Sequence, residues 1–501
     1  MTAQPADAAT APEPSPAATS GRDGRAALVP ALLLVGLVVL LGVVSWNRIT
    51  GPFGNSDEGL DSSVWAMCTR AVRDDPFGSA LGGRRPDGVD YANHPPLTCL
   101  SGAAAETIAG EEEWATRAPA WLATAALVPL TYLMLRRLRF DERVAAAGTL
   151  VAVGTPMVAT YGPMLDTPVV ALPFAAAVAA ALAGEWPAGD DPPRPWRAPV
   201  VTALALLAGL AGWQAGLLAL LGGGSLGLWG PDRRRSLPYL LGAAAGLALS
   251  LAWAAWTYGT LTDLTDKLSY RSGGDIGLVD SLRFQVDWIR ILLGASTLAL
   301  VACIASLTDD AIRPVAGLLL TTVAVWSVVL HGGAGGHQFW NYFIVLPTAL
   351  GGAWALRGLA GWVDSTSLPI RGPTLVMGLA AALALLQVTT PTLAEQLIDA
   401  GLDGGTALAE LDVPPGATEL AVVGDDVRVY AIVAYYTGLV PVPVDGAAAL
   451  GELAAADPAA PVLVVRPCSD QQPGALCRAL PDPDSDRTEV VAAAELAAQL
   501  P

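Results

Sequence analysis

Apolar runs long enough to cross a lipid bilayer recur along the chain. A helix that spans a hydrocarbon core of about 30 Å needs about 20 predominantly apolar residues. Eight runs reach or approach that length: 27–46, 116–135, 144–163, 237–258, 287–307, 314–331, 339–357 and 372–390. A shorter run at 167–183 predicts a further span, and the pair 199–213 and 214–230 predicts a tight hairpin. The pattern therefore predicts an all-α polytopic membrane protein with about eleven transmembrane helices.

The composition agrees with a membrane protein. Hydrophobic residues make up 53% of the 501 positions and charged residues only 15%, against about 25% charged in an average soluble domain. The first apolar run is longer than the roughly 7–15-residue core of a signal peptide, so we expect 27–46 to be retained as the first helix. Residues 1–26 contain few large hydrophobic side chains, and we expect a disordered cytoplasmic tail there.

The placement of Lys and Arg in the short loops predicts the orientation, because basic loops face the cytoplasm. Arginines precede the first span and cluster in alternate loops, whereas the short loops near Asp166, Gln214 and Gly335 carry no Lys or Arg. The amino terminus is then cytoplasmic, provided that the weakly apolar segment 97–109 does not cross the membrane. This topology places two long segments outside, and long loops are usually functional. They are the first outer loop, 47–115, and the second outer loop, 259–286.

Residues 392–501 follow a different pattern from the spans. The short apolar segments 419–425 and 461–467 predict buried strands, and the stretches RVYAIVAYYTG and GAAALGELAAA predict helix or strand–helix units. We therefore expect a small extracytoplasmic α/β domain. It has 17 Asp and Glu against four Arg, so most of the net charge of −18 lies there. This charge argues against nucleic acid and anionic lipid headgroups as its partners.

The cysteines follow the predicted topology. Cys68 and Cys99 share the first outer loop, Cys468 and Cys477 share the C-terminal domain, and Cys303 lies in a span. An oxidising exterior favours two local disulfides. Four unpaired thiols are the alternative.

Asp57 and Glu58 are adjacent carboxylates that follow the first span closely, at the outer membrane surface. A carboxylate beside a reacting hydroxyl can accept its proton, as glycosyl transfer to an alcohol requires. The alternative is that both residues cap a surface helix beginning near Gly59, because acidic residues favour a helix amino terminus. Taken alone, the pair favours the capping role.

The histidines gather at the predicted outer boundary of the membrane. His94 stands in the stretch YANHPPL, where two prolines fix an extended turn. A histidine there can donate hydrogen bonds to a phosphate at the level of the lipid headgroups, and an exposed turn residue is the alternative. The chain has only two other histidines, His331 and His337, and both lie at the same boundary.

Other ionisable residues on the predicted outer side are candidates for chemistry or binding. Asp166 lies in a very short loop, where a carboxylate is costly unless it has a partner or a function; capping of the next span is the alternative. Lys267, Arg271 and Arg283 place cations in the second outer loop, and a guanidinium suits phosphate geometry. Solubility of the loop is the alternative for these three residues.

Several common motifs are missing from the sequence. No Gly-rich loop with GKS or GKT indicates nucleotide hydrolysis, and no paired-Cys spacing indicates a zinc site. The spans hold few ionisable residues, which disfavours an ion pump or proton relay. No cofactor is therefore indicated, and a divalent cation stays open as an alternative.

Four sequence features together resemble a known family. They are the acidic pair after the first span, the loop ending HPPL, the stretch EEEWATRAPAW leading into a span that ends RRLR, and the late stretch GGHQFWNYFIVLPTALGGAWAL. Over about residues 28–390 the chain resembles the membrane glycosyltransferases of the protein O-mannosyltransferase and aminoarabinose-transferase type. The block from Asp57 to Leu97 is the most specific part of the likeness.

The resemblance implies a GT-C architecture and a sugar donor linked to polyprenyl phosphate. It implies that Asp57 acts as the base on a cell-envelope glycan, lipid or protein acceptor, with Glu58 supporting it. His94 matches a His or Lys that binds the donor phosphate, and Asp166 matches a second functional acid. The stretch DEGLD lacks the Arg or Tyr that often follows the acidic pair, so acceptor contacts do not carry over.

A transporter or flippase with an exterior binding domain is the alternative from another class. Such proteins usually contain internal repeats and spans broken at mid-membrane. This sequence instead concentrates its unusual polar residues in one long outer loop, which favours the transferase. Under either reading, membrane lipids surround the protein.

Overall fold

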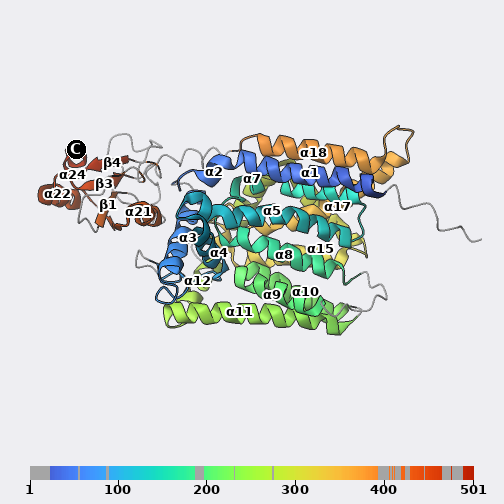
Figure 1. Cartoon of the computed structure of the whole chain (residues 1–501), viewed down its shortest axis with the longest axis horizontal. Coiled ribbons are helices and arrows are strands. Elements are labelled where there is room, and N and C mark those ends of the chain that lie inside the picture. Colours follow the sequence, from blue (N-terminus) through green and yellow to red (C-terminus); the bar gives the residue numbers. More distant parts are fainter. Residues whose placement is uncertain are drawn as a thin grey trace, which may run out of the picture.

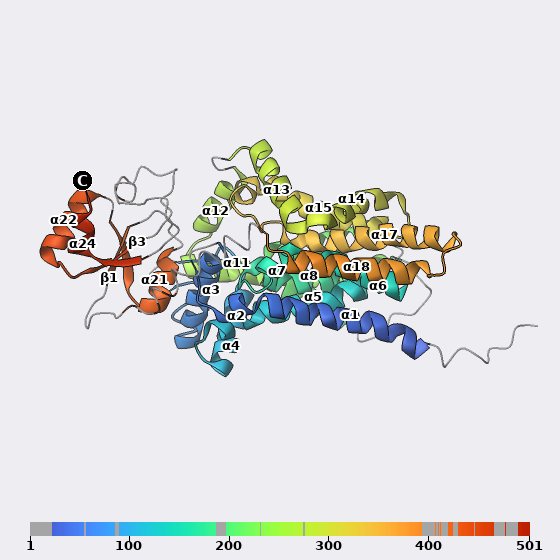
Figure 2. The same cartoon turned by 90° about the horizontal axis from the view of Figure 1, so that it is seen from above.

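The computed structural model describes residues 23–500, except for 55–56, 86–89, 187–196, 231, 274–275, 393–405, 407–408, 410, 412–418, 424–428, 445, 465–475 and 477–488. A long bundle of helices forms the larger part of the molecule (Figure 1). A small α/β unit lies beyond one end of this bundle, and the view from above shows the same arrangement (Figure 2).

Helices cover all the apolar runs of the sequence, which confirms a mostly helical polytopic membrane protein. The helices of the bundle are α1 (Asp23–Val44), α5 (Glu113–Arg137), α6 (Glu142–Val153), α7 (Pro156–Tyr161), α8 (Thr167–Ala183), α9 (Arg197–Ala211), α10 (Trp213–Trp229), α11 (Leu237–Tyr258), α13 (Leu278–Leu293), α14 (Thr297–Ala305), α15 (Arg313–Val329), α17 (Val345–Asp364) and α18 (Gly372–Thr389). Within the described ranges, five helical segments are individually long and apolar enough to cross a membrane. The other bundle helices are shorter.

Two of the predicted spans are interrupted. The run 144–163 divides into α6 and α7, because Pro156 lacks the N–H that would continue the helix. Gly154 at this break lies so close to α18 that an added Cβ would come within 2.4 Å of the Ala384 Cβ. The run 287–307 divides at Gly294, whose φ of 54° lies in the left-handed region that favours glycine.

Short helices cover the bundle end that faces the α/β unit, where the first outer loop was expected. They include α2 (Trp46–Thr50), α3 (Asp57–Asp74), α4 (Leu97–Ala109), α12 (Thr262–Ser272) and α16 (His331–Ala334). Helix α4 corresponds to the weakly apolar segment and packs against α3 and α5 at this end (Figure 1). The disulfide between Cys68 and Cys99 joins α3 to α4, as predicted. Cys468 and Cys477 lie outside the described residues.

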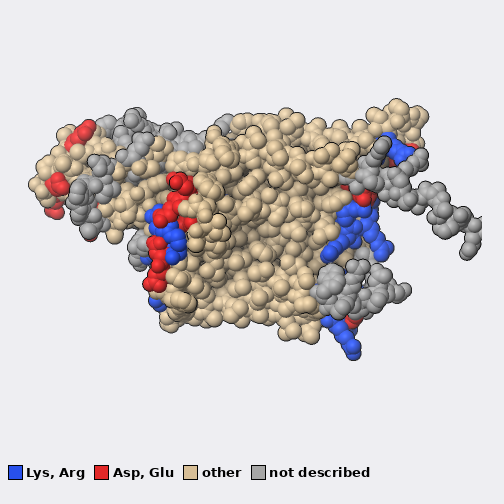
Figure 3. Space-filling model, viewed as in Figure 1, with Lys and Arg blue, Asp and Glu red and all other residues tan. Residues whose placement is uncertain are grey.

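Charged side chains occupy the two ends of the bundle. On the face shown in Figure 3, Lys and Arg gather at the end far from the α/β unit, and a mixed acidic and basic band lies at the near end. The side of the bundle between them is almost free of charge on this face. This distribution matches an apolar surface immersed in lipid.

The α/β unit contains the strands that the sequence predicts. The sheet has the order β2-β1-β3-β4, and only β4 runs antiparallel. Its elements are β1 (Glu419–Val423), α21 (Val429–Thr437), β2 (Val440–Pro443), α22 (Ala447–Ala456), β3 (Pro461–Val464), β4 (Glu489–Ala492) and α24 (Ala493–Ala498).

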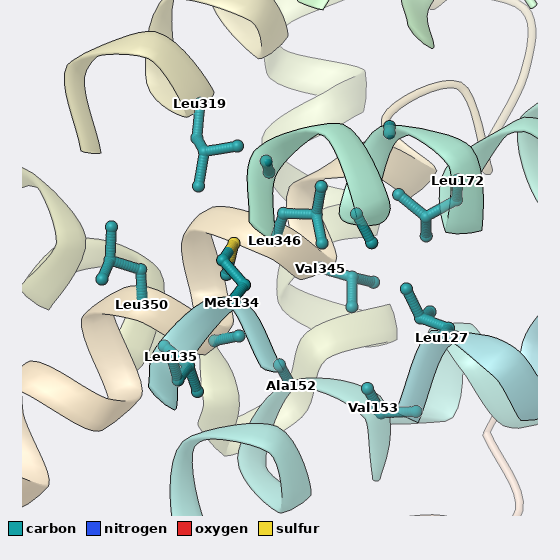
Figure 4. Packing of buried hydrophobic residues seen from close by; sticks show 14 of the residues in the cluster. Leu127, Met134, Leu135, Ala152, Val153, Leu172, Leu319, Val345, Leu346 and Leu350 are labelled. Carbon is teal, nitrogen blue, oxygen red and sulfur yellow. The ribbon is translucent and has the colours of Figure 1, made fainter. Parts of the chain in front are cut away.

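The main hydrophobic core lies inside the bundle and fixes the helices that carry the polar end. Figure 4 shows part of it, where side chains from α5, α6, α8, α15 and α17 converge. Small residues of α6 and α8, such as Ala152 and Ala175, are fully buried and allow close packing. A rigid bundle of this kind can hold the amino terminus of α8 in a constant position beside the short helices.

Candidate active site

A cavity of about 460 Å³ opens among the short helices at the bundle end that faces the α/β unit. Five of the seven site residues predicted from the sequence line this cavity, although they come from distant parts of the chain. They are His94, Asp166, Lys267, Arg271 and His337. Glu58 is not among the lining residues, and the side chain of Asp57 lies outside the described residues. His331 and Arg283, also considered from the sequence, do not line it either.

Asp166 is held at the amino terminus of α8. Its Oδ1 atom accepts hydrogen bonds from the Thr167 backbone N–H at 2.6 Å and from the Trp65 indole N–H at 2.7 Å. The capping alternative is therefore part of its role, while the same carboxylate also lines the cavity. Burial raises its pKa to about 6, against the lowering effect of these two bonds and of Arg271.

A second carboxylate of the cavity, Asp61, was missed by the sequence analysis. It lies on α3 one turn after Asp57, and Trp65 follows one turn later. Residues four apart share a face of a helix, so the spacing of Asp57, Asp61 and Trp65 was the available signal.

His94 lies in the cavity wall on a segment that three hydrogen bonds hold in place. The Tyr258 hydroxyl donates to the Asn93 side-chain oxygen at 2.7 Å and accepts from the Ala92 N–H at 2.7 Å. The Trp213 indole N–H donates to the Asn93 carbonyl at 2.7 Å. Helices α10 and α11 therefore fix the turn that presents the histidine.

The environment of His94 favours its neutral form. Burial lowers its pKa well below the usual value, and Arg271 and His337 lower it further. The Trp65 ring packs edge-on against the imidazole, with ring centroids 5.7 Å apart. A neutral imidazole can still donate one hydrogen bond, so His94 can contact an anion without adding positive charge.

The basic side chains of the cavity come from α12, from the turn before α17 and from Arg85 of the first outer loop. Lys267 and Arg271 lie one turn apart on α12, and the Arg271 guanidinium lies 5.1 Å from the centre of the Trp340 ring. The His337 ring is stacked with the Trp340 ring, with centroids 5.8 Å apart. Trp340 therefore aligns a guanidinium and an imidazole that both line the cavity.

A smaller, almost entirely apolar cavity of about 270 Å³ adjoins the first one. The two cavities share six lining residues, including His94, Lys267 and Arg271. The other residues of its wall are Asn93, Leu251, Leu264, Leu268 and Leu330. The larger, charged cavity and the smaller, apolar cavity therefore meet at His94, Lys267 and Arg271.

Glu58 is placed away from the cavity. It is fully buried and forms an ion pair with Arg117 of α5 at 3.2 Å, and it accepts a hydrogen bond from Ser62 at 3.1 Å. Arg117 also donates to the carbonyls of Gly51 and Pro52. Asp57 is the first residue of α3, and its side chain lies outside the described residues.

A divalent cation has no ready site in the described part of the chain. No group of three or more His, Cys, Asp or Glu side chains that could hold a metal ion occurs among these residues.

Comparisons with known proteins agree on the fold. No protein-family model and no curated protein sequence matches the chain. Among solved structures, the chain is similar to ArnT from Cupriavidus metallidurans bound to undecaprenyl phosphate, with a TM-score of 0.61 and 15% identity over 94% of this chain and 99% of that one. It is also similar to the Archaeoglobus fulgidus oligosaccharyltransferase in complex with Zn and sulfate, with a TM-score of 0.53 and 12% identity over 86% of this chain and 68% of that one.

These likenesses cover the bundle and most of the α/β unit, since nearly the whole chain is matched. The chain therefore has the GT-C fold of membrane glycosyltransferases. The resemblance inferred from the sequence is confirmed at the level of the fold.

Proposed function

We propose that the chain is a membrane glycosyltransferase that takes a sugar from a polyprenyl-phosphate donor and transfers it to an acceptor at the outer face of the membrane. The observation that carries this proposal is the convergence of His94, Asp166, Lys267, Arg271 and His337 on one cavity that adjoins an apolar chamber. Such a pair of spaces matches the two parts of the donor, an anionic phosphate and a hydrocarbon chain.

The phosphate group would bind to the cationic side of the larger cavity. A guanidinium offers paired N–H donors that suit phosphate oxygens, and Lys267 adds a second cation on the same helix. His94 and His337 would contribute hydrogen bonds. The polyprenyl chain would leave through the smaller cavity, whose leucines make it almost entirely apolar.

The sugar would occupy the opposite wall, at the amino termini of α8 and α10. Among the described residues, the Thr167 hydroxyl and the Gln214 side-chain nitrogen are buried there without a hydrogen-bond partner, and both residues line the cavity. An unpaired buried polar group costs about 1–3 kcal/mol. The hydroxyl groups of a bound sugar would supply the missing partners.

The reaction would be a direct displacement with inversion at the anomeric carbon. The acceptor oxygen forms a bond to the anomeric carbon while the bond between this carbon and the phosphate oxygen breaks. The lipid phosphate leaves with the electron pair of the broken bond. Asp57 would accept the proton of the acceptor hydroxyl. Glu58 would support this base through its ion pair with Arg117, which fixes the beginning of α3. Asp166, opposite the cations, would act as the second functional acid.

The orientation follows from the basic loops. With these loops in the cytoplasm, the cavity and the α/β unit both face the exterior, because they share the same end of the bundle (Figure 1). The acceptor is then a glycan, lipid or protein of the cell envelope.

Binding of undecaprenyl phosphate to the purified full-length protein tests this proposal. Arg271→Gln should weaken binding about tenfold or more, because a hydrogen bond to a charged group contributes about 1.5–3 kcal/mol. Arg283→Gln is the matched control, since Arg283 is 76% exposed and outside the cavity, and it should bind like the wild type. Equal affinity of all three proteins, or no binding by any of them, would contradict the donor assignment.

A further inference from the structure

The α/β unit touches the bundle at the segment that leads into Asp57. Helix α21 packs against α3, and the two helices lie side by side in both views (Figures 1 and 2). Leu60, on the first turn of α3, is 2% exposed and belongs to the same hydrophobic cluster as Leu420 and Ile432 of the α/β unit. The start of α3 is therefore part of the core of the second unit.

Two tyrosines of α21 hold the residue that stands four positions before Asp57. The Phe53 backbone N–H donates to the Tyr436 hydroxyl at 2.7 Å, and this hydroxyl donates to the Glu113 carboxylate at 2.9 Å. The Phe53 ring is fully buried and packs edge-on against Tyr435, with centroids 4.9 Å apart. Burial raises the pKa of Tyr436, and Glu113 raises it further, so its hydroxyl stays protonated at neutral pH.

The bundle holds the same segment from the other side. The Arg117 guanidinium lies 4.2 Å from the centre of the Phe53 ring, and its N–H groups donate to the Gly51 and Pro52 carbonyls. The segment 51–54 is therefore fixed between an arginine of α5 and two tyrosines of α21. Neither unit alone supplies all of these contacts.

A separate contact fastens α21 to α3 without touching this segment. Arg70 donates to the Tyr435 carbonyl at 2.8 Å, and its guanidinium lies 4.3 Å from the centre of the Tyr435 ring. Tyr435 therefore takes part in both this docking contact and the contact with the Phe53 ring, whereas the hydrogen bond to the Phe53 backbone comes from Tyr436.

We infer that the α/β unit is a positioning element for the catalytic base, and that Tyr436 sets the position of Asp57 through the Phe53 backbone. This inference rests on the proposed function, because it assumes that Asp57 accepts the acceptor's proton. A displacement of about 1 Å in a reacting group can lower a rate about a hundredfold. The α/β unit therefore contributes to turnover, although none of its described residues lines either cavity.

Tyr436→Phe tests the inference in the full-length protein, because it removes the hydroxyl and keeps the ring. Thr437→Val is the matched control: it also removes a hydroxyl from α21, but among the described residues that hydroxyl bonds to the Val433 carbonyl and the Leu439 N–H alone. We expect Tyr436→Phe to lower kcat about tenfold or more, because the buried Phe53 N–H loses its acceptor. Its affinity for undecaprenyl phosphate should stay within twofold of the wild type, and Thr437→Val should keep both values.

Hydrogen exchange gives a readout that does not depend on activity. The Phe53 amide should exchange about tenfold faster in Tyr436→Phe than in Thr437→Val or the wild type. Unchanged exchange, or faster exchange with kcat within twofold of the wild type, would overturn the positioning role. Equal losses of kcat and donor affinity would also overturn it, because they would indicate general disruption. If the wild type neither binds undecaprenyl phosphate nor transfers sugar, the proposed function fails, while the exchange result still reports on the contact.

Discussion

Two buried carboxylates beside opposite faces of α3, Glu58 and Asp166, have different partners. On the face toward α5, Glu58 is fully buried and is neutralised by the equally buried Arg117. On the face toward the cavity, Asp61 lines the open space and Trp65 donates a hydrogen bond to Asp166. No cation lies in ion-pair contact with Asp166 among the described residues; its bonded partners there are the two neutral N–H groups of Trp65 and Thr167.

The difference separates a structural acid from one that can respond to a ligand. Breaking a buried pair of a carboxylate and a guanidinium is strongly destabilising, because one charge is left buried without its partner. A buried carboxylate with only neutral donors has a raised pKa, as Asp166 has, and its protonation can change when an anion binds nearby. One face of α3 therefore anchors the helix, and the other face takes part in binding and chemistry.

The largest expected effect comes from Asp57, which begins the helix that both faces share. Asp57→Asn keeps the size of the side chain and removes the basic carboxylate. Because general-base assistance contributes about 10²–10⁴ in rate, turnover should fall at least about a hundredfold in a transfer assay. Affinity for undecaprenyl phosphate should be retained, since the phosphate contacts are assigned to other residues. Full activity of this variant would leave Asp57 with the capping role alone.

On the face of α3 toward α5, removal of the Glu58 charge should destabilise the protein. Glu58→Gln leaves the buried Arg117 without its counter-charge, and we expect the free energy of unfolding to fall by about 3–5 kcal/mol. Glu111→Gln is the control, because Glu111 is 56% exposed and its partners in the described part of the chain are the partly exposed Arg70 and Arg73. The loss of its charge should cost less than about 1 kcal/mol. Denaturant titration of the purified proteins measures both values. Equal, small losses in the two variants would remove the distinction between the faces.

On the face of α3 toward the cavity, Asp166 should make the affinity for undecaprenyl phosphate depend on pH. Because the pKa of Asp166 is raised to about 6, this carboxyl is mostly neutral at pH 5 and charged at pH 7. A charged Asp166 opposes an anionic ligand, so Asp166→Asn should bind undecaprenyl phosphate more tightly than the wild type at pH 7 and with equal affinity at pH 5. We expect a difference of up to about tenfold at pH 7, because a unit charge several ångströms away contributes on the order of 1–2 kcal/mol at an effective dielectric constant of about 20.

The raised pKa of Asp166 also makes the stability of the fold depend on pH. The folded state raises the pKa of Asp166 above its unfolded value, so the folded protein binds more protons between about pH 4 and 6. The contribution of Asp166 to stability therefore falls as pH rises through this window, and Asp166→Asn should remove that part of the pH dependence. If the ratio of the affinities of Asp166→Asn and the wild type for undecaprenyl phosphate were the same at pH 5 and pH 7, Asp166 would not titrate beside the ligand.

The sequence predicts the membrane helices well because a bilayer imposes a length and an apolar composition on each span. It also predicts five residues of the cavity, because polar side chains at the outer boundary need a partner or a function there. It could not predict which of these residues meet, since His94 and His337 approach only after α3, α12 and α17 have packed.

The missed residues depend on contacts between distant elements. Arg117 belongs to the stretch EEEWATRAPAW, which carried the family resemblance, yet nothing local indicates that its partner is Glu58. Likewise, Tyr436 is one of three tyrosines in the apolar segment Val429–Thr437, and nothing in its local sequence indicates a partner. Its contact with Phe53 spans 383 positions of the chain and appears only in the folded structure.

A density map of the full-length protein with bound undecaprenyl phosphate tests the central claim most directly. The account predicts that the phosphate lies within hydrogen-bond reach of Arg271 and His94 in the larger cavity, with the first isoprene units beside Leu251, Leu264 and Leu268. Asp57 would then face the same space from the start of α3. Density for the phosphate at any other place on the protein, with this cavity empty, would contradict the account.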